Sequence, residues 1–157
     1  MLRALIVSAV AAAVTSTLIQ ILLWWGFTDA SPWPLLSRDA RLTAAIVMGQ
    51  TVLPPSGGLD PMVWLVAAFI HSMLSIIYAA IVVYPASRFG IVVSMIIGTA
   101  AGVMIYIVNL YGFTAIFPWF AQSRGGITLL AHVVFGMTLA GTYTMLRENR
   151  RRPVRRS

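Results

Sequence analysis

Four apolar runs of about twenty residues divide the chain, and charged residues, prolines and glycines gather in the segments between them. The runs cover residues 4–26, 61–84, 89–110 and 127–146. A helix of about twenty apolar residues is long enough to cross the hydrocarbon core of a bilayer. The pattern predicts an all-α membrane protein with a four-transmembrane-helix bundle. Residues 1–146 would form one transmembrane domain, and residues 147–157 a basic cytoplasmic tail.

Polar side chains are rare inside these runs, and they fall on one helical face of each run. Gln20 follows Thr17 in the first run, Ser75 follows His71 in the second, and Asn109 lies near the end of the third. Polar groups are costly in lipid and usually face the interior of a bundle. We therefore expect Gln20, Ser75 and Asn109 to form a polar interior.

The connection between the first two runs, residues 27–60, contains a shorter apolar segment. Residues 40–53 follow Ser37 and Asp39, which are candidate helix caps, and they end at Pro54 and Pro55. A helix of this length reaches roughly 21 Å, short of the about 30 Å of a hydrocarbon core. We expect a short interfacial or re-entrant helix in the first external loop. The alternative is half of a broken transport helix.

A string of glycine, aromatic residues, threonine and proline occurs twice in the chain. The first copy consists of Gly26, Phe27, Thr28, Pro32 and Trp33, and the second of Gly112, Phe113, Thr114, Pro118 and Trp119. An aromatic residue precedes each copy at the end of an apolar run, where a span meets water. The string is typical of an interfacial anchor, and its repetition predicts two tandem hairpins in the same orientation. Such parallel repeats are related by an axis along the membrane normal.

The duplication brings the two histidines of the chain to a similar depth. His71 and His132 stand at nearly the same distance from the cytoplasmic ends of their spans, which are marked by Pro85 and Arg147. Two facing histidines could hold a b-type haem through axial nitrogens, or another metal that binds imidazole. They could also lie on a path for protons or solutes. The simplest expectation is no cofactor, with neutral imidazoles bonded between helices.

Composition and charge narrow the class of protein further. The chain of 157 residues is 59% hydrophobic and only 10% charged, with a mean hydropathy of +0.88. Soluble domains carry about 25% charged residues. With no cysteine, thiolate metal sites and cysteine nucleophiles are excluded. Every basic residue is arginine, and the terminal run predicts an anchor on anionic lipid rather than binding to nucleic acid.

The distribution of arginines predicts the orientation. Eight lie on the side of both termini, against Arg38, Arg41 and Arg124 on the other. Positive charge is enriched in cytoplasmic segments. We expect both termini in the cytoplasm and both copies of the repeated string on the far face.

Residues 108–132 carry a resemblance to a known group, in the string VNLYGFTAIFPWFAQSRGGITLLAH. This string resembles small four-span bacterial inner-membrane proteins of unknown function, some of which are labelled sodium:proline symporters. The resemblance extends over most of the chain. It implies the fold and a location in the bacterial inner membrane, and it adds no catalytic residue.

The sequence lacks the patterns of an enzyme: an acidic pair inside a span, a glycine-rich phosphate loop, or a nucleophile with its base. Asp29, Asp39 and Asp60 fall in or beside the first external loop, where Arg38 and Arg41 could pair with them or share a docking face. We expect a non-enzymatic accessory, assembly or stabilising subunit whose partners are the bilayer and other membrane subunits or itself. One alternative is an electron-transfer subunit with haem on His71 and His132. Another is a small oligomeric channel or transporter that depends on Gln20, Asn109 or the histidines.

Overall fold

The computed structural model describes residues 2–54 and 59–151, and this part of the chain is helical without strands. The α-helices are α1 (Leu2–Phe27), α2 (Pro32–Met48), α3 (Pro61–Ala86), α4 (Ile91–Ile107) and α5 (Gly126–Arg151). Short 3-10 or π turns form η1 (Gln50–Val52), η2 (Val108–Gly112), η3 (Phe113–Ala115) and η4 (Pro118–Ser123). Within the described residues, four helical segments are long and apolar enough to cross a membrane. The expected all-α bundle of a multi-pass membrane protein is confirmed at this level.

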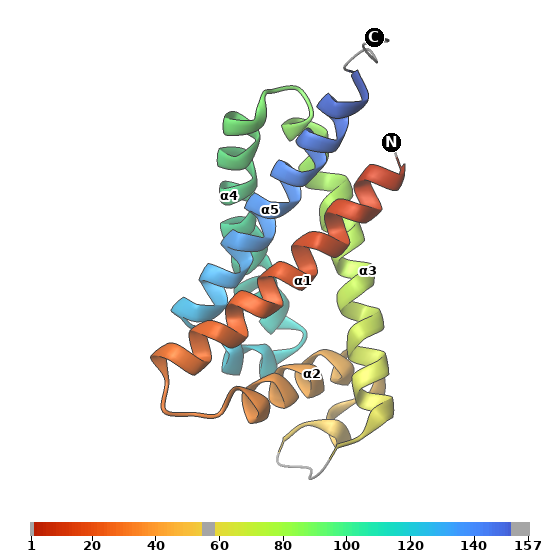
Figure 1. Cartoon of the computed structure of the whole chain (residues 1–157). Coiled ribbons are helices and arrows are strands. Elements are labelled where there is room, and N and C mark those ends of the chain that lie inside the picture. The colour runs from red at the N-terminus through yellow and green to blue at the C-terminus, as the bar shows by residue number, and fades with distance from the viewer. Residues whose placement is uncertain (1, 55–58, 152–157) are drawn as a thin grey trace.

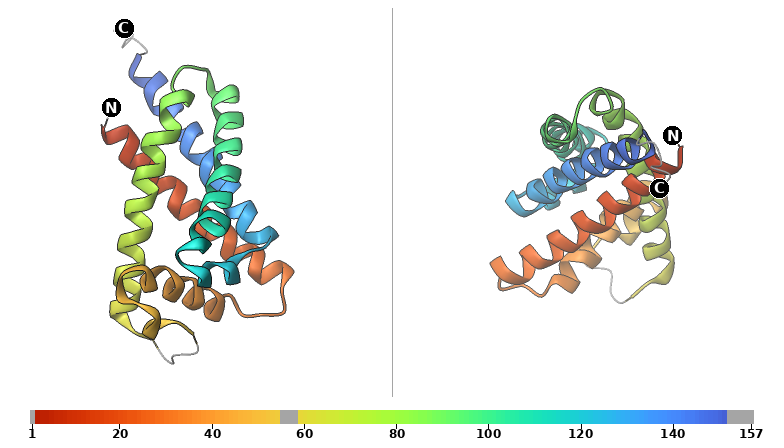
Figure 2. Two further views of the ribbon diagram at one scale, coloured as in Figure 1. Left: turned by 180° about the vertical axis from the view of Figure 1, so that it is seen from behind. Right: turned by 45° about the horizontal axis from the view of Figure 1, so that its top comes forward.

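Helices α1 and α5 lie side by side through the middle of the bundle (Figures 1 and 2). Helix α4 packs mainly on α5, while α3 contacts α1 and α2 and approaches α4 more sparsely. Helix α2 lies across the end of the bundle opposite to the two termini (Figure 1). The connecting turns η1 to η4 gather at that same end, so one end of the bundle is covered by short helical segments.

Glycines bring the backbones of α4 and α5 into direct contact. A Cβ atom added at Gly98 would collide with the carbonyl oxygen of Gly136, and one added at Gly102 would collide with that of His132. Small residues spaced by four allow such an approach between membrane helices. The small-residue seam of α4 is therefore occupied by α5 of the same chain.

Helix α2 differs from the predicted short helix at both ends. The expected bounds of 40–53 were wrong: the helix begins at Pro32 and ends at Met48. Proline is well suited to the first turn of a helix, where its missing N–H has no partner to lose. Gly49, with φ of 83°, then stops the helix because this backbone conformation favours glycine. Consequently Ser37 and Asp39, the candidate caps, lie inside the helix, and Pro55 lies outside the described residues.

The ends of α3 and α5 test two further boundaries. Asp60 caps α3 as its position before Pro61 suggests, and its Oδ1 accepts from the backbone nitrogens of Met62 (2.9 Å) and Val63 (3.4 Å). Helix α5 continues to Arg151, beyond the expected start of the tail at 147. Arg147 remains helical and donates to the Phe89 carbonyl (3.1 Å), which joins α5 to the turn after α3. The remainder of the expected tail, residues 152–157, lies outside the described residues.

The two copies of the repeated string are alike in part, because in each the threonine hydroxyl bonds back into the preceding turn, four residues back in the first copy and three in the second. The hydroxyl of Thr28 donates to the carbonyl of Trp24, and that of Thr114 donates to the carbonyl of Tyr111, both at 2.6 Å. In each copy the following proline begins a helix, α2 in the first and η4 in the second. Each string thus closes one long helix and starts a short one.

The tryptophans of the two copies make different contacts with the short helix α2. Trp33 belongs to α2 itself and stacks on Trp64 of α3, with ring centroids 5.2 Å apart. Trp119 lies in η4 and donates its indole N–H to the Leu42 carbonyl of α2 (2.9 Å). Both contacts hold α2 against the end of the bundle.

Candidate functional site

A partly open cavity of about 380 Å³ lies between the helices at the end covered by α2, and its lining includes the exposed residues Ala68 and His71. Its walls come from α1, α3, α5 and the last turn of α4, and α2 and η4 contribute the remainder. Pockets that bury small organic molecules range from about 300 to 1,000 Å³. The cavity is therefore large enough for a small ligand.

The candidate residues predicted from sequence converge on this cavity. His71, His132, Gln20, Ser75 and Asn109 all line it, although they come from α1, α3, α5 and the turn after α4. One residue of the repeated string, Phe113, joins them, whereas the other members of that string do not line the cavity. The polar faces of the four long segments thus open onto a common space.

His132 has a defined hydrogen bond on one ring nitrogen. Its Nδ1 lies 2.8 Å from the carbonyl oxygen of Thr128, which can only accept, so Nδ1 carries the proton. In the neutral imidazole this leaves Nε2 as an acceptor. The ring of Tyr106 meets His132 edge-on at 5.7 Å between centroids. His71 and Asp39 line the same cavity as this imidazole.

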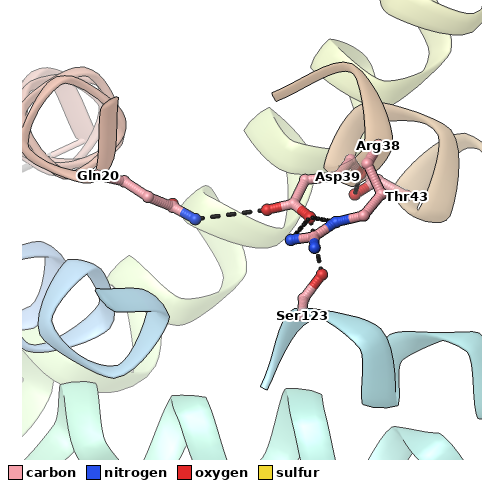
Figure 3. Close-up of polar contacts among 5 residues, drawn as sticks. All are labelled: Gln20, Arg38, Asp39, Thr43 and Ser123. Carbon is pink, nitrogen blue, oxygen red and sulfur yellow. Dashed lines mark hydrogen bonds and ion pairs between the residues drawn. The ribbon is translucent and has the colours of Figure 1, made fainter. Parts of the chain in front are cut away.

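Asp39 lines the cavity, although the sequence suggested for it only a helix cap, an ion pair or a docking face. Figure 3 shows its carboxylate among Gln20, Arg38 and Ser123. Its Oδ1 accepts from Nε and Nη2 of Arg38 at 3.0 and 2.8 Å and from the hydroxyl of Ser123 at 2.8 Å. Its Oδ2 faces the amide nitrogen of Gln20 at 3.4 Å. The carboxylate thereby connects α1, α2 and η4 at the mouth of the cavity.

A helical pattern in α2 could have revealed Asp39. Once the helix is taken to begin at Pro32, Leu36, Asp39, Ala40 and Thr43 fall on one face at spacings of three or four residues. All four of these residues line the cavity. The predicted start at residue 40 placed Leu36 and Asp39 outside the helix, so this face could not be recognised.

The end of α4 is held in place by two side chains from elsewhere in the chain. Here the helix widens into the π turn η2, a feature that often marks functional positions. Tyr78 of α3 donates to Oδ1 of Asn109 within this turn. Arg124 donates through Nε to the Leu110 carbonyl (2.7 Å), and its guanidinium lies 4.2 Å from the ring centroid of Tyr111. These contacts fix the wall of the cavity at Asn109.

The cavity and the neighbouring pocket differ in the charged residues that line them. Among the described residues that line it, Asp39 alone carries a formal charge when both histidines are neutral. Arg38 and Arg124 instead line a neighbouring pocket of about 290 Å³. Among the described residues, no group of three or more His, Asp or Glu side chains could hold a metal ion. The cavity thus offers one carboxylate, imidazole and amide groups, and aromatic walls.

No protein-family model, curated protein or solved structure matches the chain. The resemblance to small inner-membrane proteins therefore stays a prediction. The chemistry of the cavity has to be interpreted from its own residues.

Proposed function

We propose that this protein binds a small solute within the bacterial inner membrane and acts as a channel or transporter, with the cavity as its binding site. The observation that carries the proposal is the convergence of Gln20, His71, Asn109 and His132 on one space. Titratable side chains inside a membrane span typically face the bundle interior or a water-filled cavity, and they mark solute or proton pathways. In a bundle of this size, such a site would operate alone or within an oligomer.

We further propose an architecture of two tandem parallel hairpins, α1 with α3 and α4 with α5. The start of a short helix at the proline of each repeated string, Pro32 and Pro118, supports this relation. Both termini would be cytoplasmic, with the arginine-rich end on anionic lipid and α2 as an interfacial helix on the external face.

The packing of the two hairpins is unequal, because α4 contacts α5 more closely than α1 contacts α3. The wider spacing in the first hairpin leaves room for the cavity.

An accessory subunit is the other role expected from sequence, and part of the surface that it would use packs within the chain. Such a subunit would present small-residue seams and aromatic residues to other membrane proteins. Gly98 and Gly102 instead contact α5, and Trp119 is bonded to α2. These contacts do not fill the cavity, and solute binding would use it.

Cysteine labelling tests whether solutes enter the cavity. The chain has no cysteine, so Ala68→Cys provides a single thiol on the cavity wall. We expect N-ethylmaleimide to label this variant at least about tenfold faster than Ala80→Cys, because the reactive thiolate forms in water and is disfavoured in lipid. Ala80 is a matched control, since it is exposed on the same helix and does not line the cavity. Equally slow labelling of both variants would contradict solute access and the proposed function.

Electron transfer through haem is the second candidate, and the geometry of His132 favours it. The Nδ1 bond to Thr128 orients the ring and leaves Nε2 for a metal, an arrangement common among metal-binding histidines. His71 lines the same cavity. Haem held there would supply one-electron chemistry, and the two imidazoles would orient it.

An absorption spectrum of the protein purified from membranes tests this candidate. If haem is bound, we expect a Soret band that His71→Ala and His132→Ala each remove, because both axial ligands are needed. Tyr106→Phe is the control: it keeps the ring beside His132 and should keep the band. Absence of a Soret band, or a band that survives both histidine substitutions, removes the haem hypothesis and leaves solute binding unaffected.

A further inference from the structure

The carboxylate of Asp39 presents one poorly satisfied oxygen to the cavity. Oδ1 accepts three hydrogen bonds, two from Arg38 and one from Ser123, all at 3.0 Å or less. Oδ2 has only the Gln20 amide at 3.4 Å, which exceeds the usual N–H···O range of about 2.7–3.2 Å. A carboxylate oxygen can accept two bonds. Oδ2 therefore has capacity for a donor supplied by a ligand.

The positive charges near the cavity do not fill that capacity. Arg38 binds the opposite oxygen of Asp39 and lines the neighbouring pocket rather than the cavity. Among the residues that line the cavity there is no arginine or lysine. An anionic ligand would find no formal positive charge there, whereas a cationic ligand would meet Asp39.

Several aromatic side chains line the same cavity as this carboxylate. Trp24, Trp64 and Phe120 line the cavity, and Trp24 is almost fully buried. Aromatic faces attract organic cations, most strongly where the contact is shielded from water. The acceptor Nε2 of His132 adds a neutral partner for a second donor.

We propose that the ligand of this cavity is an amphiphilic organic cation, a protonated amine on an aromatic or apolar body. The ammonium group binds Oδ2 of Asp39, and the body lies against the aromatic wall. The inference rests on the proposed function, since it names the class of solute for the same site. The charge balance and the wall chemistry both lead to this class.

Protection of the Ala68→Cys variant from N-ethylmaleimide tests the inference in phosphatidylcholine vesicles. The probes are tryptamine, a cation, and tryptophol, in which a hydroxyl replaces the ammonium on the same indole body. We expect tryptamine to protect the thiol at about tenfold lower concentration than tryptophol, because one added contact between opposite charges strengthens binding by about that factor. Asp39→Asn in the same background should abolish this difference.

Two more variants separate a charge effect from a folding effect. Asp29→Asn removes a carboxylate from an exposed position outside the cavity and should leave the difference unchanged. Gln20→Lys places an internal ammonium beside Oδ2 and leaves the Oδ1 bonds to Arg38 and Ser123 intact. It should abolish the advantage of tryptamine even if Asp39→Asn proves unstable.

The outcomes distinguish this inference from the function on which it rests. If Ala68→Cys reacts rapidly and tryptophol protects as well as tryptamine, the cavity admits solutes but does not select cations, and the inference is wrong. The same holds if neither probe protects, or if the advantage of tryptamine persists in both Asp39→Asn and Gln20→Lys. If Ala68→Cys reacts as slowly as Ala80→Cys, the proposed function fails as well.

Discussion

Replacing Gly136 by alanine is expected to destabilise the bundle by about 3 kcal/mol, a large fraction of the stability of a small protein. The added methyl group would collide with the carbonyl oxygen of Gly98 and come within 2.8 Å of the Gly102 backbone nitrogen. Both obstacles are backbone atoms, so α4 and α5 would have to separate. Unfolding in mixed micelles with sodium dodecyl sulfate, followed by helical circular dichroism, measures the change.

The same helix supplies a matched control. A Cβ atom at Gly141 would lie 3.4 Å from Cγ of Met95, an ordinary contact with a flexible side chain. Gly141→Ala should therefore leave the free energy of unfolding within about 0.5 kcal/mol of the original, or raise it slightly. Similar stabilities for the two variants would show that the close contact of α4 with α5 is absent.

Replacing Arg124 by alanine is expected to lower the free energy of unfolding by about 2 kcal/mol. The Leu110 carbonyl would lose a charged donor at 2.7 Å, and Thr114 would lose its bond to Nη2 at 3.0 Å. The stacking of the guanidinium on Tyr111 would also disappear. Because η2 carries Asn109, the bond between Tyr78 and Asn109 should weaken with it. The same detergent titration measures the loss.

Arg88 provides the comparison for this prediction. It also lies over a tyrosine ring, 4.7 Å from the centroid of Tyr84, and bonds the hydroxyl of that residue (2.7 Å). Its contacts remain at an exposed helix end, so Arg88→Ala should change the free energy of unfolding by no more than about 0.5 kcal/mol. If Arg124→Ala were as mild as Arg88→Ala, the guanidinium would not be holding the π turn.

The long helices could be predicted from sequence because their boundaries depend on local features. Continuous apolar runs define the four spans, and Asp60 before Pro61 marks the start of α3 through a cap and a first-turn proline. The cost of polar groups in lipid also led to the expectation that His71 and His132 face other helices, and both line the cavity. These inferences need no knowledge of which helices pack together.

The remaining features depend on contacts between segments far apart in the chain. The prolines at 32 and 34 indicated a loop, although the first turn of a helix suits them equally well. Asp39 belongs to the cavity because η4 returns to the same place and brings Ser123 to its carboxylate. The two prolines were compatible with a loop and with the first turn of a helix. Nothing in the sequence placed Ser123 next to Asp39.

The central pairing of α1 with α5 has a consequence for biogenesis. Synthesis proceeds from the N-terminus, so the ribosome releases α1 long before its chief neighbour exists. The first three apolar segments are each more hydrophobic than α5, which is also the most deeply buried of the four. The early helices can therefore partition into the bilayer by themselves, whereas α5 gains its place from helices that are already inserted. A chain truncated before α5 would leave α1 in the membrane as a client for quality-control proteases.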